Sequence, residues 1–111
     1  MKIIKRNGAE AIFDESKIYA AVSKANAAVD HADRISEEDI QKISDNVTEK
    51  CRKLLRPAGV EEIQDMVERE IMSLGAFTLA KTYITYRYTR ELVRKSNTTD
   101  ESIMALIEHN N

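Results

Sequence analysis

Residues 2–14, KIIKRNGAEAIFD, carry the most informative local pattern of this chain. Two short β-prone runs, residues 2–5 and 11–13, flank Asn7-Gly8, and both of these residue types tolerate the positive φ angles of a tight hairpin turn. Asp14 follows as the expected N-cap of a helix, because its carboxylate can accept hydrogen bonds from the free N–H groups of the next turn. The stretch therefore predicts a β-hairpin that leads directly into a helix.

The rest of the chain carries helical periodicity. Apolar residues recur at spacings of three and four over residues 15–29, 36–55, 61–74 and 77–94, which predicts four amphipathic helices. Ser36 marks a helix start and Gly75 a helix end. The expected inward-facing residues are Ile18, Ala21, Val22, Ala25 and Val29; Ile40, Ile43, Val47, Cys51, Leu54 and Leu55; Ile63, Met66, Val67, Ile71 and Leu74; and Phe77, Ala80, Ile84, Tyr88 and Leu92. The predicted fold class is mainly α with a small β part: a four-helix bundle capped by the hairpin.

Composition supports this prediction and excludes several other classes. The chain has 111 residues, of which 42% are hydrophobic and only 5% aromatic, with three glycines and one proline, so it fits one helical domain better than a sandwich or barrel. A single cysteine, Cys51, excludes an internal disulfide framework and a Cys-rich zinc ribbon. No apolar run is long enough to cross a bilayer and no apolar region follows the basic N-terminus, so we expect a cytoplasmic protein without a membrane partner.

The charge is unevenly distributed along the chain. The net charge is only −2, which argues against binding to nucleic acid. Residues 31–80 carry 11 acidic and 7 basic side chains, whereas residues 81–95 carry 5 basic residues and 1 acidic residue. Lys2, Lys5 and Arg6 make the N-terminus basic too. The two basic segments are either ordinary solvated faces or parts of one anion site.

The arrangements typical of enzymes are absent from the sequence. His31 and His109 are the only histidines, and their separate positions suggest neither a metal cluster nor a Cys/His pair. The three glycines are isolated, so there is no Gly-rich phosphate loop of the Walker type. Acidic residues fall at helix starts and on expected exposed faces. We therefore predict no catalytic residue and no metal ligand in this chain.

One group of residues has a sharper interpretation. Lys5, Arg6 and Asn7 leave the first strand at the hairpin turn, and Lys17 lies in the first turn of the following helix. Cations, turn N–H groups and a helix N-terminus would then converge on one spot, which is how proteins hold phosphates without a Walker loop. Phe13 and Ile18 are candidates for an apolar wall against a nucleotide base.

Four ordered blocks of the sequence resemble the ATP-cone domain. They are IxKRNG at residues 3–8, FDxxKI at 13–18, VxxIQDxVE at 60–68 and AKxYIxYR at 80–87. The resemblance covers residues 2 to about 92. It implies a four-helix bundle capped by an N-terminal β-hairpin or a three-stranded sheet, which binds ATP or dATP, with or without Mg²⁺, between sheet and helices. The family regulates ribonucleotide reductases and also occurs in a bacterial repressor of their genes.

The resemblance also implies roles for individual residues. Lys5, Arg6 and Lys17 would contact the triphosphate, next to Asn7 of the turn. The base and sugar would be lined by Ile3, Phe13, Ile18 and Ile63, with polar contacts from Asp14 and Gln64. The last helix would close the site with Lys81, Thr85, Arg87 or Tyr88, although Arg87 and Tyr83 have a buried or structural role as an equal alternative. Cys51 is expected to be a buried apolar residue and not the cysteine that carries the thiyl radical in the catalytic domain of such a reductase.

The C-terminal segment indicates what kind of parent protein to expect. Residues 94–111 resemble the passage from cone to catalytic domain in anaerobic (class III) ribonucleoside-triphosphate reductases, which implies a cone over residues 1–93 and a linker with the start of a catalytic domain over 94–111. The fragment itself would be non-catalytic. The parent would be a homo-oligomeric oxidoreductase that makes deoxyribonucleotides for DNA replication, activated by ATP and inhibited by dATP.

Two alternatives stay open from the sequence. The gene repressor fits less well, because its cone follows a Cys-rich zinc ribbon and the cone here begins at residue 2. The other alternative is a helical interaction module that binds no nucleotide and docks a protein partner through its acidic face at residues 37–70.

Overall fold

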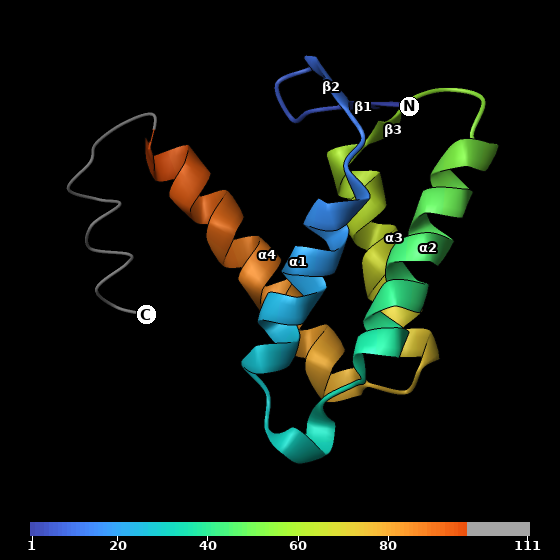
Figure 1. The fold of residues 1–111 in the computed structure, drawn as a ribbon. Coiled ribbons are helices and arrows are strands. Elements are labelled where there is room, and N and C mark those ends of the chain that lie inside the picture. Colours follow the sequence, from blue (N-terminus) through green and yellow to red (C-terminus); the bar gives the residue numbers. More distant parts are fainter. Residues whose placement is uncertain (98–111) are drawn as a thin grey trace.

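Three helices stand side by side with a small sheet across one end, and a fourth helix crosses them obliquely (Figure 1). This computed structural model describes the backbone of residues 1–97 and the side chains of residues 1–89. The elements are β1 (Lys2–Ile4), β2 (Glu10–Ile12), α1 (Glu15–Ala27), the short 3₁₀ turn η1 (His31–Asp33), α2 (Glu37–Lys53), β3 (Ala58–Gly59), α3 (Val60–Ser73) and α4 (Phe77–Asn97). The predicted fold class is confirmed.

The sheet has the strand order β2-β1-β3. β1 pairs with β2 in antiparallel register, with Ile3 opposite Ala11, and with β3 in parallel register, with Ile3 opposite Ala58. Gly8 has a φ of 85° in the hairpin turn, a conformation that glycine adopts without a Cβ penalty. The hairpin predicted from Asn7-Gly8 is therefore confirmed, and β3 ties it to the residue that precedes α3.

Local side-chain contacts fix the starts of the helices. The Asp14 carboxylate accepts hydrogen bonds from the Ser16 N–H (3.0 Å) and hydroxyl (2.6 Å) at the start of α1. The Ser36 hydroxyl accepts from the Asp39 N–H (3.1 Å) at the start of α2. Gly75, with a φ of 77°, ends α3. These three predicted helix ends are confirmed.

The core consists mainly of the predicted stripes of the first three helices. Leu55 and Leu74, however, were predicted to face inward and do not. Leu55 is fully exposed and Leu74 is 44% exposed, because α2 and α3 end at Lys53 and Ser73, just before them. The buried members of these stripes are Ile18, Val22, Ala25, Val29, Ile40, Ile43, Val47, Cys51, Ile63, Val67 and Ile71.

The predicted inner face of α4 is wrong. Phe77, Ile84 and Tyr88 are exposed, and the buried side chains are Leu79, Ala80 and Tyr83. α4 contacts both α1 and α3, so it buries the side that fits between those two helices. Of the predicted stripe only Ala80 is confirmed, and Leu92 lies outside the described side chains.

α4 continues to Asn97, beyond the expected end at residue 94. Residues 98–111, which include the expected start of a catalytic domain, fall outside the described residues. Within the described part of the chain, no helix has the length and apolar character needed to span a membrane.

Candidate functional site

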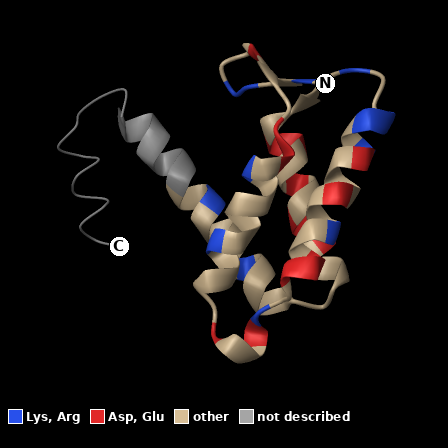
Figure 2. Ribbon diagram, in the orientation of Figure 1, with Lys and Arg blue, Asp and Glu red and all other residues tan. Residues whose placement is uncertain are grey.

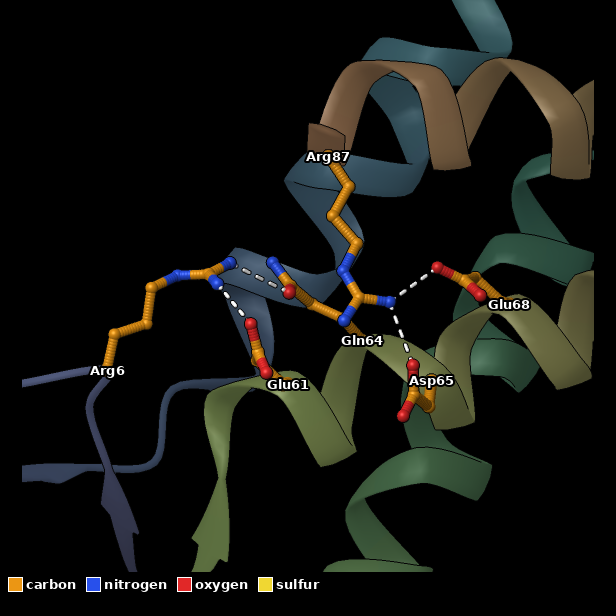
Figure 3. A network of polar contacts seen from close by, with 6 residues as sticks. All are labelled: Arg6, Glu61, Gln64, Asp65, Glu68 and Arg87. Carbon is orange, nitrogen blue, oxygen red and sulfur yellow. Dashed lines mark hydrogen bonds and ion pairs between the residues drawn. The ribbon is translucent and has the colours of Figure 1, made fainter. Parts of the chain in front are cut away.

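The end of the bundle beneath the sheet collects most of the residues singled out in the sequence. The hairpin turn lies there beside the first turns of α3, and a side chain from α4 reaches the same helix from the other side (Figure 3). Acidic positions are dense on α2 and α3, and basic positions lie on the hairpin, α1 and α4 and also on α2 (Figure 2). One arginine from each basic segment of the sequence, Arg6 and Arg87, contacts α3.

Arg6 joins the hairpin turn to α3. Its Nη1 donates to Glu61 Oε1 at 2.6 Å and its Nη2 donates to Gln64 Oε1 at 3.0 Å. Glu61 and Gln64 are three residues apart, so they share one face of the helix. The Arg6 side chain is only 23% exposed. The structure therefore brings together two of the predicted site residues, Arg6 and Gln64.

Arg87 reaches α3 from α4. Its Nη1 donates to Asp65 Oδ1 at 2.9 Å and to Glu68 Oε1 at 2.6 Å. Burial works against its charge, but the hydrogen bonds that Asp65 and Glu68 accept outweigh this and raise the pKa of Arg87. The Arg87 side chain is only 19% exposed, and its two ion pairs connect α4 to α3. Tyr83, one turn earlier, is buried.

The remaining polar residues of the hairpin and α1 differ in what they offer to a ligand. Lys5 and Lys17 have exposed side chains. The Asn7 side chain accepts from the Ala9 N–H at 3.0 Å and shapes the turn. Asp14 caps α1, and the hydrogen bond from the Ser16 hydroxyl, followed by that from its N–H, lowers the pKa of the Asp14 carboxyl. The two lysines are thus presented to solvent, whereas Asn7 and Asp14 already make local contacts.

The four predicted apolar contact residues divide into two pairs. Ile3 and Phe13 are partly buried and pack against the edge of the core, whereas Ile18 and Ile63 lie within it, at 7% and 8% exposure. A flat aromatic ligand would therefore meet Ile3 and Phe13 first.

Two residues of α4 that were expected to close the site, Lys81 and Thr85, lie on a different face of the helix from Arg87. Lys81 and Thr85 line a groove of about 430 Å³ together with Thr82, Tyr86 and Thr89. Lys24 of α1 lies over the Tyr86 ring, with its Nζ 5.0 Å from the ring centroid. Successive residues of an α-helix are rotated by 100° about its axis, so the residues that line this groove lie on a side of α4 that points away from Arg87. Tyr88 is 64% exposed. The structure does not bring Lys81 or Thr85 into contact with the Arg6 cluster.

The acidic partners of the two arginines were missed in the sequence. Glu61, Asp65 and Glu68 were interpreted as helix-start or solvent-facing residues. The available signal was their spacing, because residues 61, 64, 65 and 68 fall on one side of a helix. That signal points to cationic partners without saying which arginines supply them.

A second contact fixes the start of α3. Arg56 binds the Glu62 carboxylate through both terminal nitrogens, at 2.7 and 2.8 Å, and Glu62 Oε1 also accepts from the Gly59 N–H at 3.0 Å. The hydrogen bond from Arg56, followed by that from Gly59, lowers the pKa of Glu62 to about 2. This arrangement holds the β3–α3 junction and so positions Glu61 and Gln64.

The site combines the exposed ammonium groups of Lys5 and Lys17 with two guanidinium groups that are bound to carboxylates of α3. Among the described residues, no group of three His, Cys, Asp or Glu side chains is arranged to hold a metal ion. The Cys51 thiol is buried in the core, and this burial, with a smaller contribution from Glu62, raises its pKa.

Comparison with known proteins gives a family match. The ATP cone domain matches residues 1–92. The chain is 32% identical over 111 residues to the ribonucleoside-diphosphate reductase subunit alpha of Chlamydia muridarum, covering 93% of this chain and 11% of that protein. It is 34% identical over 99 residues to the vitamin B12-dependent ribonucleoside-diphosphate reductase of Thermoplasma acidophilum, covering 85% of this chain and 12% of that protein. It is 31% identical over 111 residues to the anaerobic ribonucleoside-triphosphate reductase of Haemophilus influenzae, covering 98% of this chain and 15% of that protein.

Proposed function

The chain belongs to the ATP-cone family, and we propose that it is the nucleotide-sensing regulatory domain of a larger ribonucleotide reductase. The observation that carries this proposal is the position of Arg6: the hairpin turn places it against Gln64 at the start of α3, within the matched residues 1–92. The chain spans between 11% and 15% of the three reductases described above. The radical chemistry would therefore belong to other parts of the parent.

The ligand in this proposal is ATP or dATP, with or without Mg²⁺. Lys5, Arg6 and Lys17 would hold the triphosphate near the N-terminus of α1, where free N–H groups and the helix dipole favour anions. Ile3 and Phe13 would contact the base, and Gln64 would supply a polar contact. Support comes from the exposure of both lysines and from the partial exposure of the two apolar residues.

Thermal unfolding tests this binding proposal. A ligand present at 100 times its Kd adds about 2.7 kcal/mol to stability, which raises the Tm of a domain of this size by several degrees. We expect this rise with ATP and with dATP, and we expect a Lys5→Ala/Arg6→Ala variant to lose it. A Lys42→Ala/Lys53→Ala variant removes two exposed charges from α2 and should keep it. A Tm unmoved by millimolar nucleotide in the wild type would contradict the proposal and favour the helical interaction module.

The regulatory part of the proposal is a coupling between the cone and the rest of the parent. ATP would permit activity and dATP would inhibit it, so each nucleotide must favour a different arrangement of the homo-oligomeric parent. The two ligands differ only in the 2′-hydroxyl. The test is the activity and the mass distribution of the full-length parent with each nucleotide. Identical values with ATP and dATP would contradict this coupling.

We further propose that the parent is an anaerobic ribonucleoside-triphosphate reductase of the cytoplasm, with its linker beginning at residue 94. Support comes from the resemblance of residues 94–111 to such enzymes and from the alignment with the Haemophilus influenzae protein, which covers 98% of the chain. Assaying the parent without oxygen on CTP and on CDP tests this assignment. Reduction of CDP alone would place the parent among the diphosphate reductases.

A further inference from the structure

The contact between Arg6 and α3 has a consequence for any phosphate that uses this arginine. Glu61 and Gln64 accept from separate terminal nitrogens of the Arg6 guanidinium, as Figure 3 shows. Carboxylate and phosphate oxygens bind a guanidinium through the same planar fork of N–H groups. A phosphate oxygen that binds the Nη1 N–H group from which Glu61 now accepts must therefore displace Glu61.

Glu61 differs from the other acidic residues on this face of α3. Asp65 and Glu68 are held by Arg87, which reaches them from α4. Arg6 of the hairpin turn binds Glu61 of α3, and the Glu61 side chain is 60% exposed. An exposed carboxylate can move aside into water at low cost. Asp65 is similarly exposed, at 55%, but it shares the Arg87 guanidinium with Glu68, which is only 18% exposed.

We propose that Glu61 is a built-in competitor for the polyphosphate of the nucleotide. In this proposal, which rests on the proposed function, ligand binding exchanges the Arg6–Glu61 ion pair for an Arg6–phosphate pair. The exchange removes one tie between the hairpin turn and α3. Glu61 therefore lowers the affinity for nucleoside polyphosphates and links occupancy of the site to the position of the hairpin.

Neutralising Glu61 tests the proposal. Glu61→Gln keeps the shape of the side chain and removes its charge. We expect it to tighten the binding of ATP by about two- to fivefold, the equivalent of one exposed ion pair. Inorganic tripolyphosphate should show the same gain, because the competition is for phosphate oxygens alone. The gain should shrink in 0.5 M salt, where charges at the surface are screened.

Two further variants complete the experiment. Glu49→Gln removes the same charge from an exposed position on α2, and we expect its Kd for ATP to match the wild type. Gln64→Glu gives Arg6 a second carboxylate and should weaken both ligands, so the proposal can be tested even if Glu61→Gln fails to fold.

Calorimetric titration separates the outcomes. If the wild type binds ATP but Glu61→Gln binds it equally or more weakly, the competitor role is wrong and the proposed function stands. If Gln64→Glu leaves affinity unchanged, the competition at Arg6 is also refuted. If the wild type and all variants bind neither ATP nor tripolyphosphate, the proposed function itself fails and this inference fails with it.

Discussion

The sequence allowed two roles for Arg87, and the structure shows which contacts its side chain makes. The sequence left it open as a nucleotide contact or a structural residue. In the structure, one guanidinium nitrogen donates to both Asp65 and Glu68, and Glu68 is only 18% exposed. Truncating Arg87 would leave a carboxylate in a partly buried position without its cation.

We therefore predict that Arg87→Ala destabilises the fold by about 1–3 kcal/mol, the cost of leaving a buried polar group without its partner. Urea unfolding measures this change. Lys81→Ala, an exposed position on the same helix, should stay within about 0.5 kcal/mol of the wild type. Equal stability of the two variants would refute the structural role of Arg87.

Glu62 gives a prediction with a pH dependence. Its folded pKa of about 2 lies below the ordinary 4.5, so the stability it contributes is present above pH 4.5 and disappears as the pH falls towards 2. Glu62→Gln should therefore be less stable than the wild type at pH 7. The difference between their urea midpoints should close between pH 4.5 and 2.

Glu49→Gln is the control for this pH series, because Glu49 is exposed and makes one long ion pair, at 3.9 Å. Its midpoint should follow that of the wild type at each pH. A gap between Glu62→Gln and the wild type that stays constant from pH 7 to pH 2 would show that the Arg56–Glu62 contact adds no stability.

Cys51 is a core residue with a sulfur atom. Its side chain is 4% exposed, and burial raises its thiol pKa, so it should react slowly with thiol reagents until the protein unfolds. Cys51→Ala should cost about 1–2 kcal/mol through lost packing and leave the Kd for ATP unchanged. A large loss of ATP affinity at preserved fold would contradict this assignment.

At the scale of elements, the hairpin carries the most demanding backbone conformation of the site. The φ of 85° at Gly8 is unfavourable for residues with a Cβ, and no atom beyond Gly8 and its two chain neighbours lies within 4 Å of a Cβ placed there. Gly8→Ala should therefore cost about 1 kcal/mol from the backbone alone. Gly8→Asn should cost less, because asparagine tolerates this region. Equal urea midpoints for both variants and the wild type would contradict the turn geometry.

Elements whose signals are local could be predicted from the sequence. The hairpin turn at Asn7-Gly8 and the helix ends at Asp14, Ser36 and Gly75 depend on residues within one turn of the chain. β3 could not be predicted from the periodicity, because a strand of two residues exists only through its parallel pairing with β1. The inner face of α4 was predicted wrongly, because apolar residues lie on more than one side of that helix and packing against α1 and α3 decides between them.

For the molecule as a whole, the basic residues of the site could be predicted from the sequence better than the acidic residues that bind them. It singled out Arg6 and Gln64, which the fold brings into contact. It also grouped Lys81 and Thr85 with them, although these residues line a different face of α4. Long-range pairs such as Arg6–Glu61, 55 residues apart, need the packing of the hairpin on α3, which no local pattern encodes.

Nucleotide binding at the hairpin turn can be measured by calorimetric titration of the 111-residue chain with ATP and with dATP. We predict micromolar binding of both nucleotides by the wild type and loss of that binding in Lys5→Ala/Arg6→Ala. Unequal affinities would add that this domain itself distinguishes the 2′-hydroxyl. Absence of heat with either nucleotide, or undiminished binding by the variant, would contradict a phosphate site at the hairpin turn.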